Sequence, residues 1–356
     1  MVPNLLLAAE SLSAGNGGIC RVASLMRKVL AEEVQAGRLI AGGLVLSDPE
    51  PCLGKGLQVK TARGRRLKFA WEAYRAALSH THFLYDFVGM ARAHCRLPLL
   101  RRPFLTWIHG IEVWEGTRPD RLAWGRRANM LLSNSAFTRD RADRLHGGFA
   151  RARVCWLATE TDQLPAARQV QSGPPSVLLI GRFDEGDRYK GHRELIGCWP
   201  KVVSIVPDAR LVFVGRGPGR PVIEQLALQS PARSHIEFKG FVPDEELPAV
   251  WAGTSVFAMP SRGEGFGLVY IEAMRQGVPV VASVHDAAPE VNINGVTGFN
   301  VNLDNPEELP ERLICLLKDP SLAAQLGCNG RERWRQNFRF SCFRERFLPL
   351  LREFLK

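Results

Sequence analysis

Short apolar runs alternate with longer amphipathic segments along most of this chain of 356 residues. Short runs bounded by glycine and proline predict buried strands, whereas apolar positions that recur every three or four residues predict helices. Strands are expected at 1–10, 39–48, 81–87, 102–110, 177–180, 209–214, 235–240, 255–259 and 278–282. Helices are expected at 19–29, 63–80 and 268–276, and the chain from Pro306 onward is expected to be mainly helical. This alternation predicts an α/β protein with parallel sheets.

The stretch 254–283 gives the clearest strand–helix–strand pattern. A strand at 255–259 is followed by a glycine-rich loop at 260–267, a helix at 268–276 and a second strand at 278–282. The two strands of such a unit are parallel, and ligands bind beyond their carboxyl ends. The loop at 260–267 is therefore expected to lie on the ligand side of a sheet.

Two carboxylates stand out in this stretch. Glu264 lies in the loop and Glu272 lies about a turn into the helix, while Gly265 and Gly267 flank Phe266 and let the backbone pass close to a bound group. The free amides at the helix start, from Leu268, suit a phosphate or sugar oxygen, and a carboxylate accepts hydrogen bonds from sugar hydroxyls. The alternative is that the acidic residues only complement the helix dipole.

The string PSRGEGFGLVYIEAMRQGVPVVAS resembles the E-x7-E region of retaining glycosyltransferase family 4, which has the GT-B fold. Glu264 and Glu272 fall on the two glutamates of that motif. The resemblance implies two Rossmann-like domains whose parallel sheets face a central cleft. It places an acceptor-binding domain at 1–165, a nucleotide-sugar-binding domain at 166–335, and a C-terminal helix at 336–356 that crosses back to the first domain.

In the first half, the resemblance singles out a glycine loop and a histidine. Gly17 and Gly18 open the helix at 19–29 and match the loop that approaches the donor diphosphate and sugar. His109, at the end of the strand 102–110, lies in HGIEVW, which resembles a His-Gly-x-(Asp/Glu) segment. It is expected to position the transferred sugar by donating to a hydroxyl, supported by Glu112. The alternative for a lone His is a structural role.

In the second half, two cations follow the strand 177–180. Arg182 and Lys190 are suited to a diphosphate, Arg as a bidentate fork and Lys as a point charge. The alternative is an exposed loop of mixed charge. The resemblance to a Gly-Arg…Lys-Gly pair favours the diphosphate. It also places the nucleotide base at the turn containing Val242.

The resemblance implies a retaining transfer of a hexosyl group from a UDP- or GDP-linked sugar to a saccharide or lipid-linked glycan, as in surface polysaccharide or glycolipid biosynthesis. His109, Arg182, Lys190 and Glu264 are the expected catalytic residues. No Asp-x-Asp occurs in the chain, so no metal and no cofactor are expected. The relatives' Asn-Gly is replaced by Ala158, Thr159 and Glu160, and no role is carried over there.

Positive charge is concentrated in the first half of the chain. Residues 1–165 carry 24 Lys/Arg and 14 Asp/Glu, or +10 of the total +11. A basic face can attract anionic lipid, although arginine-rich surfaces can also be merely solvated. The helix at 63–80 places one apolar face together, made of Leu67, Ala70, Trp71, Tyr74 and Leu78. Packing on the sheet is the ordinary role of such a face, and membrane contact is the alternative.

Several features bear on localisation and on other function classes. No apolar run approaches the roughly 20 residues of a spanning helix, and the scattered cysteines suggest reduced thiols. A cytoplasmic protein, peripheral at the inner membrane face, is therefore expected. One alternative function is a non-hydrolysing sugar-nucleotide epimerase, which shares the architecture. A basic nucleic-acid-binding protein is less favoured, because no aromatic residues are interleaved with the basic ones as such sites require.

Overall fold

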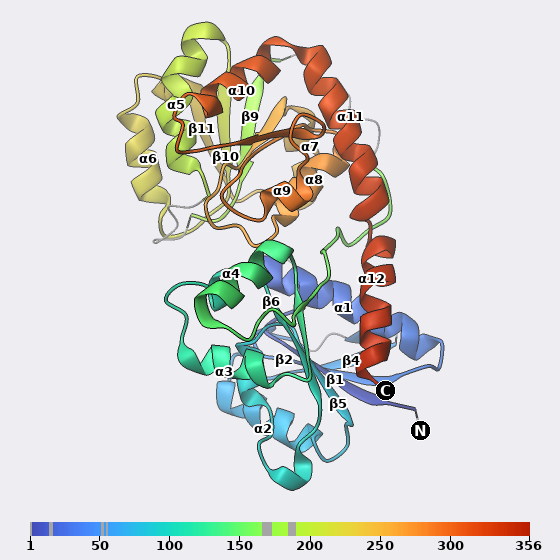
Figure 1. Cartoon of the computed structure of the whole chain (residues 1–356). Coiled ribbons are helices and arrows are strands. Elements are labelled where there is room, and N and C mark those ends of the chain that lie inside the picture. Colours follow the sequence, from blue (N-terminus) through green and yellow to red (C-terminus); the bar gives the residue numbers. More distant parts are fainter. Residues whose placement is uncertain (1, 14–16, 51–52, 55, 166–172, 184–189) are drawn as a thin grey trace. The chain divides into compact units, whose positions relative to one another are not determined.

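The computed structural model describes residues 2–13, 17–50, 53–54, 56–165, 173–183 and 190–356. The chain forms two compact units (Figure 1). Unit 1 comprises Met1–Thr161 and Arg339–Lys356, and unit 2 comprises Asp162–Phe338. Each unit is a sheet flanked by helices, which confirms the predicted α/β class with two mainly parallel sheets.

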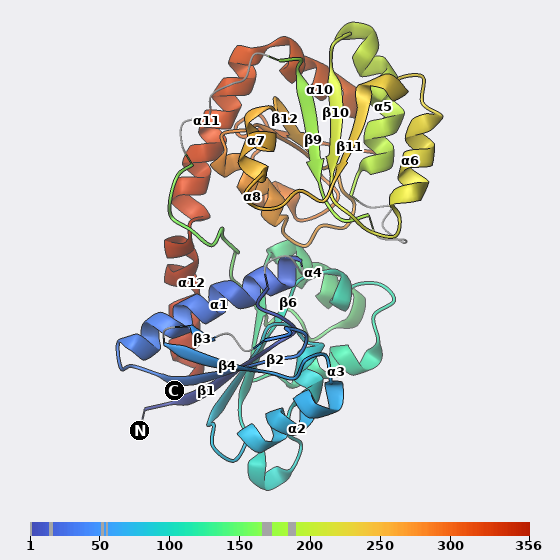
Figure 2. The same ribbon diagram turned by 180° about the vertical axis from the view of Figure 1, so that it is seen from behind.

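The sheet of unit 1 has the strand order β3-β4-β2-β1-β5-β6-β7-β8 in the described residues. Neighbouring strands are parallel except for the antiparallel pair β3–β4 at one edge, which the apolar pattern did not predict (Figure 2). The strands are β1 (Asn4–Ala9), β2 (Ile40–Val45), β3 (Leu53–Gly54), β4 (Leu57–Thr61), β5 (His82–Tyr85), β6 (Phe104–Ile108), β7 (Met130–Ser133) and β8 (Arg153–Val154). The strand order reverses between β1 and β5, and ligands bind at such a switch point.

The helices of unit 1 are α1 (Gly18–Gln35), α2 (Arg66–Ala76), α3 (Pro119–Arg127), α4 (Ala136–His146) and α12 (Phe340–Phe354), with 3₁₀ turns η2 (Met90–Ala93), η3 (Pro98–Leu100) and η4 (Ile111–Val113). Helix α2 corrects one expectation. It buries Phe69 and Ala73, whereas Leu67 is 88% exposed and Trp71 is 63% exposed. The expected face is therefore divided: Tyr74 packs against the same buried cluster as Phe69, while Leu67 and Trp71 point to solvent.

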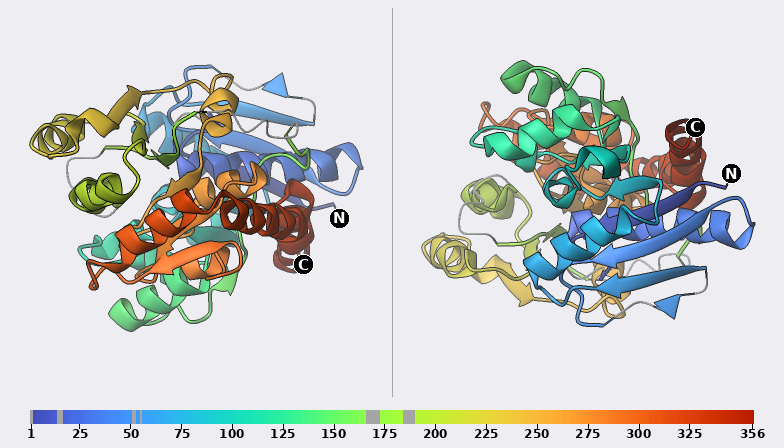
Figure 3. Two further views of the ribbon diagram at one scale, coloured as in Figure 1. Left: turned by 90° about the horizontal axis from the view of Figure 1, so that it is seen from above. Right: turned by 90° about the horizontal axis from the view of Figure 1, so that it is seen from below.

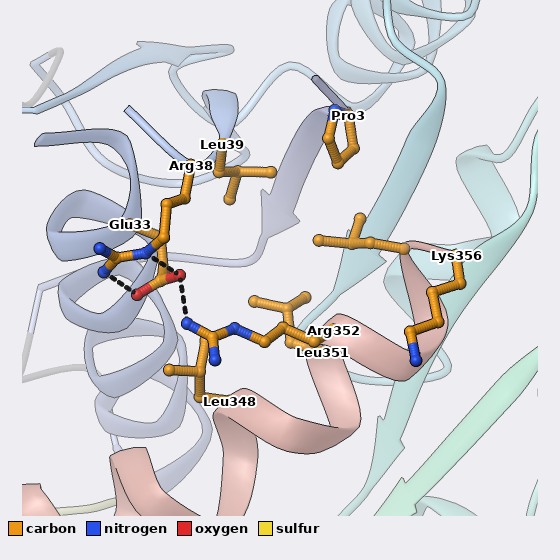
Figure 4. Close-up of a pocket in the computed structure, with 9 residues that line it drawn as sticks. Pro3, Glu33, Arg38, Leu39, Leu348, Leu351, Arg352 and Lys356 are labelled. Atoms are coloured by element: carbon orange, nitrogen blue, oxygen red, sulfur yellow. Dashed lines mark hydrogen bonds and ion pairs between the residues drawn. The ribbon is translucent and has the colours of Figure 1, made fainter. Parts of the chain in front are cut away.

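Helix α12 returns to unit 1 and packs beside α1, so the two chain ends lie close together (Figures 1 and 3). Glu33 on α1 is buried and receives hydrogen bonds from Arg38, at 3.0 Å to Oε2, and from Arg352 on α12, at 3.2 Å (Figure 4). A pocket beside this cluster is lined by both Pro3 and Lys356. The shared carboxylate thus ties the C-terminal helix to the first helix.

Replacing Glu33 by Gln is expected to lower the free energy of unfolding by about 1 kcal/mol at pH 7, a small value because both guanidinium groups are about half-exposed. The hydrogen bond from Arg38 lowers the pKa of Glu33. The loss should therefore fade as the pH falls below 4.5 and the wild-type carboxylate takes up its proton. Urea unfolding measures this. Glu353→Gln, which removes an exposed ion pair of α12, should have a smaller effect.

Unit 2 contains a parallel sheet with the strand order β11-β10-β9-β12-β13-β14. Renumbered from the first strand of the unit, this is the 3-2-1-4-5-6 order of a dinucleotide-binding fold, whose switch point lies between β9 and β12. The strands are β9 (Ser176–Ile180), β10 (Arg210–Val214), β11 (Ile236–Gly240), β12 (Val256–Ala258), β13 (Val280–Ser283) and β14 (Gly298–Val301).

The helices of unit 2 are α5 (His192–Ile205), α6 (Arg220–Leu228), α7 (Leu247–Ala252), α8 (Leu268–Arg275), α9 (Ala288–Val291), α10 (Glu308–Lys318) and α11 (Pro320–Asn337), with the 3₁₀ turn η5 (Arg233–His235). The predicted strand–loop–helix–strand unit at 254–283 is confirmed as β12, α8 and β13. In the described part of the chain no helix is both long and apolar enough to cross a membrane.

Candidate functional site

The switch point of unit 2 brings together two segments that the sequence analysis singled out. Gly181 and Arg182 follow β9, and the loop with Glu264 follows β12, the strand beside β9. Residues 184–189 lie outside the described part, and the chain re-enters at Lys190, just before α5. The carboxyl ends of adjacent parallel strands thus carry the predicted cations and the predicted carboxylate to one edge of the sheet.

Lys190 and Glu264 form an ion pair, with 3.2 Å between Nζ and Oε2. Both side chains are mostly buried, at 16% and 21% exposed. The glycine at position 191 lets the Lys190 segment approach the Glu264 loop closely. A Cβ at this position would lie 2.6 Å from Cδ of Pro260, the first residue of that loop. Two residues predicted for different parts of a donor therefore contact each other directly.

Arg182 follows β9 at the same edge of the sheet and is exposed. Its position depends on the backbone that follows β9, where Gly181 N–H donates to Val214 O at 2.9 Å. Gly215 has φ +143°, and a Cβ there would lie 1.8 Å from Gly181 O. The glycine therefore lets the ends of β9 and β10 meet beneath Arg182.

The glycine-rich loop enters α8 through Gly267, whose φ of +85° favours glycine. The Phe266 ring is buried and packs edge-on against Phe338 at 6.0 Å, so at this position only the main chain can serve a ligand. Gly265 is buried, and Leu268 and Glu272 are half-buried on the path into α8. The structure places these predicted donor-binding residues in one loop and the helix that follows it.

Asp286 organises this loop and was not predicted. Its side chain is buried and accepts from Ser261 Oγ and, at 2.9 Å, from the N–H groups of Glu264 and Ala288. In addition, Glu264 O accepts from Ala287 N–H at 3.1 Å. The segment after β13 thus holds Glu264 from both sides. An acidic residue shortly after an expected strand was the only signal available in the sequence.

Replacing Asp286 by Asn is expected to lower the free energy of unfolding by about 1–3 kcal/mol at pH 7, because the new NH₂ group must face a backbone N–H. Burial raises the pKa of Asp286 to about 6. The folded protein therefore takes up this proton between about pH 6 and 4, before the unfolded chain does, and the wild type gains stability over that range. The deficit of the variant in urea unfolding should grow from pH 7 to pH 4. Equal stability at every pH would contradict this role.

The turn after β11 carries Val242, which is half-buried. The turn starts beside the end of β10, because Gly215 N–H donates at 2.8 Å to the carbonyl oxygen of Gly240, the last residue of β11. Beside it, the Arg216 guanidinium lies 4.6 Å from the ring centre of Phe241, which is 54% exposed. This is the turn at which the nucleotide base was expected.

His192, next to the Lys190 segment, was also missed. It is buried against Phe183, with ring centres 4.5 Å apart. Burial, together with the nearby Lys190 charge, lowers the pKa of His192 to about 4. The ring is therefore neutral at pH 7 and adds no positive charge to the edge of the sheet.

In unit 1 the predicted residues lie around the switch point between β1 and β5. Gly17 is the N-cap of α1 with φ +106°, and Gly18 is the first helical residue. Residues 14–16, which include Gly15 of the same loop, lie outside the described part. The helix start therefore lies at the carboxyl end of β1, where its free amides can meet a ligand.

His109 follows β6 and is held from several sides. Its backbone N–H donates to Glu112 Oε1, its carbonyl accepts from Asn134 Nδ2 at 2.9 Å, and its Nε2 lies 2.7 Å from Asp86 O. A carbonyl only accepts, so Nε2 carries the proton, and burial lowers the pKa of His109. The ring is therefore neutral with Nδ1 as its acceptor. This changes the expected role, because His109 can accept from a sugar hydroxyl rather than donate to it.

Asp86, at the end of β5, is a further residue that the sequence analysis missed. It is fully buried, and its Oδ2 accepts from Glu10 N–H at 2.8 Å. Its Oδ1 has no hydrogen-bond partner among the described residues. Burial raises the pKa of Asp86 well above its usual range. Its backbone positions His109, while its side chain joins the ends of β1 and β5.

The two switch points present complementary chemistry. Unit 2 offers Arg182, Lys190 and the start of α8 for anionic oxygens, and Glu264 and Glu272 for hydroxyls. Unit 1 offers the start of α1 and the neutral His109. The described residues contain no cluster of three or more His, Cys, Asp or Glu arranged to hold a metal ion.

Comparison with known proteins agrees with this arrangement. Residues 160–333 match the family model "Glycosyl transferases group 1". The chain is 32% identical over 283 residues to the GDP-mannose-dependent alpha-(1-6)-phosphatidylinositol monomannoside mannosyltransferase of Mycolicibacterium smegmatis, covering 71% of this chain and 72% of the relative. It is 32% identical to the corresponding Mycobacterium tuberculosis enzyme over 64% of each chain.

Solved structures agree in fold. Sucrose-phosphate synthase from Thermosynechococcus elongatus matches with a TM-score of 0.81 and 22% identity, covering 99% of this chain and 98% of that one. HepE from Anabaena, in complex with UDP-glucose, matches with a TM-score of 0.74 and 19% identity, covering 98% and 99%. With the family match and the M. smegmatis relative, these findings lead to one conclusion: the chain belongs to the group 1 glycosyl transferases, with the GT-B fold.

Proposed function

We propose that this protein is a retaining hexosyltransferase that uses a GDP- or UDP-linked sugar without a metal ion. The observation that carries the proposal is the meeting of Lys190 and Glu264 at the switch point of unit 2, beside Arg182. A nucleotide sugar needs cations for its diphosphate and acceptors for its sugar hydroxyls within a few ångströms of each other. This edge of the sheet supplies both.

The ion pair between Lys190 and Glu264 suggests how the donor enters. The two charges satisfy each other at 3.2 Å. A bound diphosphate would attract Nζ of Lys190, which releases the Glu264 carboxylate to accept from sugar hydroxyls. Glu272 and the amides at the start of α8 complete the contacts on this side.

Stabilising the leaving nucleoside diphosphate is the main catalytic task in this proposal. Arg182, Lys190 and the N-terminus of α8 then donate to the charge that develops as the glycosidic bond breaks. The acceptor hydroxyl then attacks the face from which the diphosphate departs, so the configuration is retained. His109 accepts from a hydroxyl of the transferred sugar through Nδ1 and keeps the sugar in place.

A mannosyl donor is the first candidate, because several relatives are GDP-mannose-dependent mannosyltransferases. We propose a saccharide or lipid-linked acceptor in glycolipid or surface polysaccharide synthesis. Unit 1 then works at the anionic inner membrane face, a location supported by exposed Leu67 and Trp71 beside the basic residues of α2.

A thermal-shift screen of the purified protein against GDP- and UDP-sugars, with EDTA present throughout, tests the proposal. Bound ligand raises the unfolding temperature in proportion to the logarithm of its concentration over Kd. We expect one nucleotide series to stabilise the protein although EDTA is present. No response to any nucleotide, together with salt-sensitive binding of RNA or DNA, would reject the proposal. Conversion of the donor to an isomer without release of sugar would instead identify an epimerase.

A further inference from the structure

An arginine-lined groove of about 570 Å³ lies in unit 1. It opens at the carboxyl ends of β1, β2 and β5, where Glu10, Leu46 and Phe87 line it. Its walls come from α2, η2 and α3. The groove therefore lies at the switch point of unit 1, the place where doubly wound sheets bind ligands.

The lining residues carry an excess of positive charge. Five arginines face two carboxylates, a difference of +3, and these residues are Arg66, Arg92, Arg96, Arg118, Arg121, Glu10 and Asp120. Asp120 is already paired with Arg92, at 3.0 Å, and with Arg118, at 3.3 Å. The Glu10 carboxylate accepts from Ser47 Oγ at 2.7 Å. The acidic groups thus have partners within the protein.

The positive charge of three of the arginines is not balanced by a nearby carboxylate in the described part of the chain. In the described part of the chain, no carboxylate lies within ion-pair distance of Arg66, Arg96 or Arg121. The Arg96 guanidinium lies 5.0 Å from the ring centre of Trp124, which holds it along the groove wall. Nε of Arg121 is buried and has no hydrogen-bond partner among the described residues. A buried donor of this kind costs free energy until an acceptor reaches it.

The floor of the groove is apolar and fixed. Phe69, Met90 and Trp124 are buried beneath it, and Leu67 stands exposed at its rim. A site with an apolar floor and several guanidinium groups suits a molecule that presents a sugar or alkyl surface together with anionic oxygens. A neutral glycan could accept hydrogen bonds from these guanidinium groups but would leave their positive charge without a counter-charge.

We propose that this groove binds the acceptor of the transferase through an anionic group, a phosphate or a carboxylate, carried by that acceptor. The inference rests on the proposed function, since it assigns the substrate class of the same enzyme. The two sources of the anion, a phosphorylated sugar and a uronic acid, share the chemistry that arginine recognises. Binding of one glycoside of each kind distinguishes the two sources.

The test compares octyl glucoside, octyl glucoside 6-phosphate and octyl glucuronide by isothermal titration calorimetry on the full chain. We expect one or both anionic glycosides to bind at least tenfold more tightly than the neutral one. Arg96→Ala and Arg121→Ala should each reduce this preference about tenfold or more. Arg75→Ala, an exposed arginine on α2 outside the groove, should keep it. Preference for the phosphate or for the uronate identifies the source.

Two outcomes would overturn the inference: equal binding of neutral and anionic glycosides, or an anionic preference that both groove variants retain. Circular dichroism on each variant confirms folding, so a loss of binding is not mistaken for a loss of structure. Nucleotide binding by the wild type is measured in the same preparation. If nucleotides bind and the anionic preference is absent, the groove inference fails while the proposed function stands. If the preference is present and no nucleotide binds, the proposed function fails while the groove remains an anion site.

Discussion

Arg182→Ala and Lys190→Ala are each expected to reduce turnover by roughly 10²–10³-fold, the loss typical when a preorganised group that stabilises developing charge is removed. Donor affinity should fall much less, because the diphosphate in the ground state keeps the helix N-termini and the remaining cation. Steady-state kinetics with the identified donor separate kcat from KM. Loss of equal size in turnover and in donor binding would contradict the leaving-group role.

The Lys190 variant has a second expected effect and a matched control. Removing Lys190 leaves the mostly buried Glu264 without the cation that lies 3.2 Å from it, so some stability should be lost as well. Lys201 on α5 is also paired with a glutamate, Glu307, but both are exposed. Lys201→Ala should therefore retain both turnover and stability. A similar loss in the two variants would show that Lys190 acts only through general charge or packing.

Gly215→Ala is expected to disrupt the edge of the sheet beneath Arg182. The new Cβ would lie 1.8 Å from Gly181 O, and φ +143° is itself strained for any side chain. Neither strand can move away easily, because Gly181 N–H and Gly215 N–H are both bonded to neighbouring strands. We expect a loss of about 3 kcal/mol or more in the free energy of unfolding, with loss of turnover because Arg182 is displaced.

Gly197→Ala is the matched control for this substitution. Gly197 lies inside α5, and an added Cβ would have no atom within 4 Å of it, so alanine should stabilise the helix by about 0.5–1 kcal/mol. Urea unfolding of the two variants compares a glycine required by close approach with one that is not. Wild-type stability of Gly215→Ala would refute the close contact between the ends of β9 and β10.

The sequence was most informative where the apolar pattern and the rules for parallel strand–helix–strand units lead to the same prediction. The run 254–283 predicted β12, the glycine loop, α8 and β13, because its apolar stretches are short and its glycines mark the turns. The same pattern placed Glu264 and Arg182 at the carboxyl ends of strands. Lys190 and Glu264 come into contact because β9 and β12 are neighbours in the sheet. No local sequence pattern encodes which strands are neighbours.

The features missed by the sequence analysis depend on contacts between distant segments. Asp286 and Asp86 are single carboxylates whose hydrogen bonds join different strand ends, so nothing local distinguishes them from surface residues. Helix α2 shows the opposite error. Leu67 and Trp71 belong to an evident apolar stripe, yet they are exposed, and the residues that the helix buries are Phe69 and Ala73. The side chains that α2 buries are those that face β2 and η2. The apolar pattern of the helix alone does not indicate which neighbours it will have.

The most direct test of a metal-independent retaining transferase is the anomer of the sugar that the purified protein releases from its donor. The α-linked GDP- or UDP-sugar identified by the screen is incubated with the protein and EDTA, and ¹H NMR spectra are recorded before mutarotation. We predict that the sugar formed first is the α anomer and that EDTA does not slow its release. A β anomer formed first, or activity abolished by EDTA, would contradict the account.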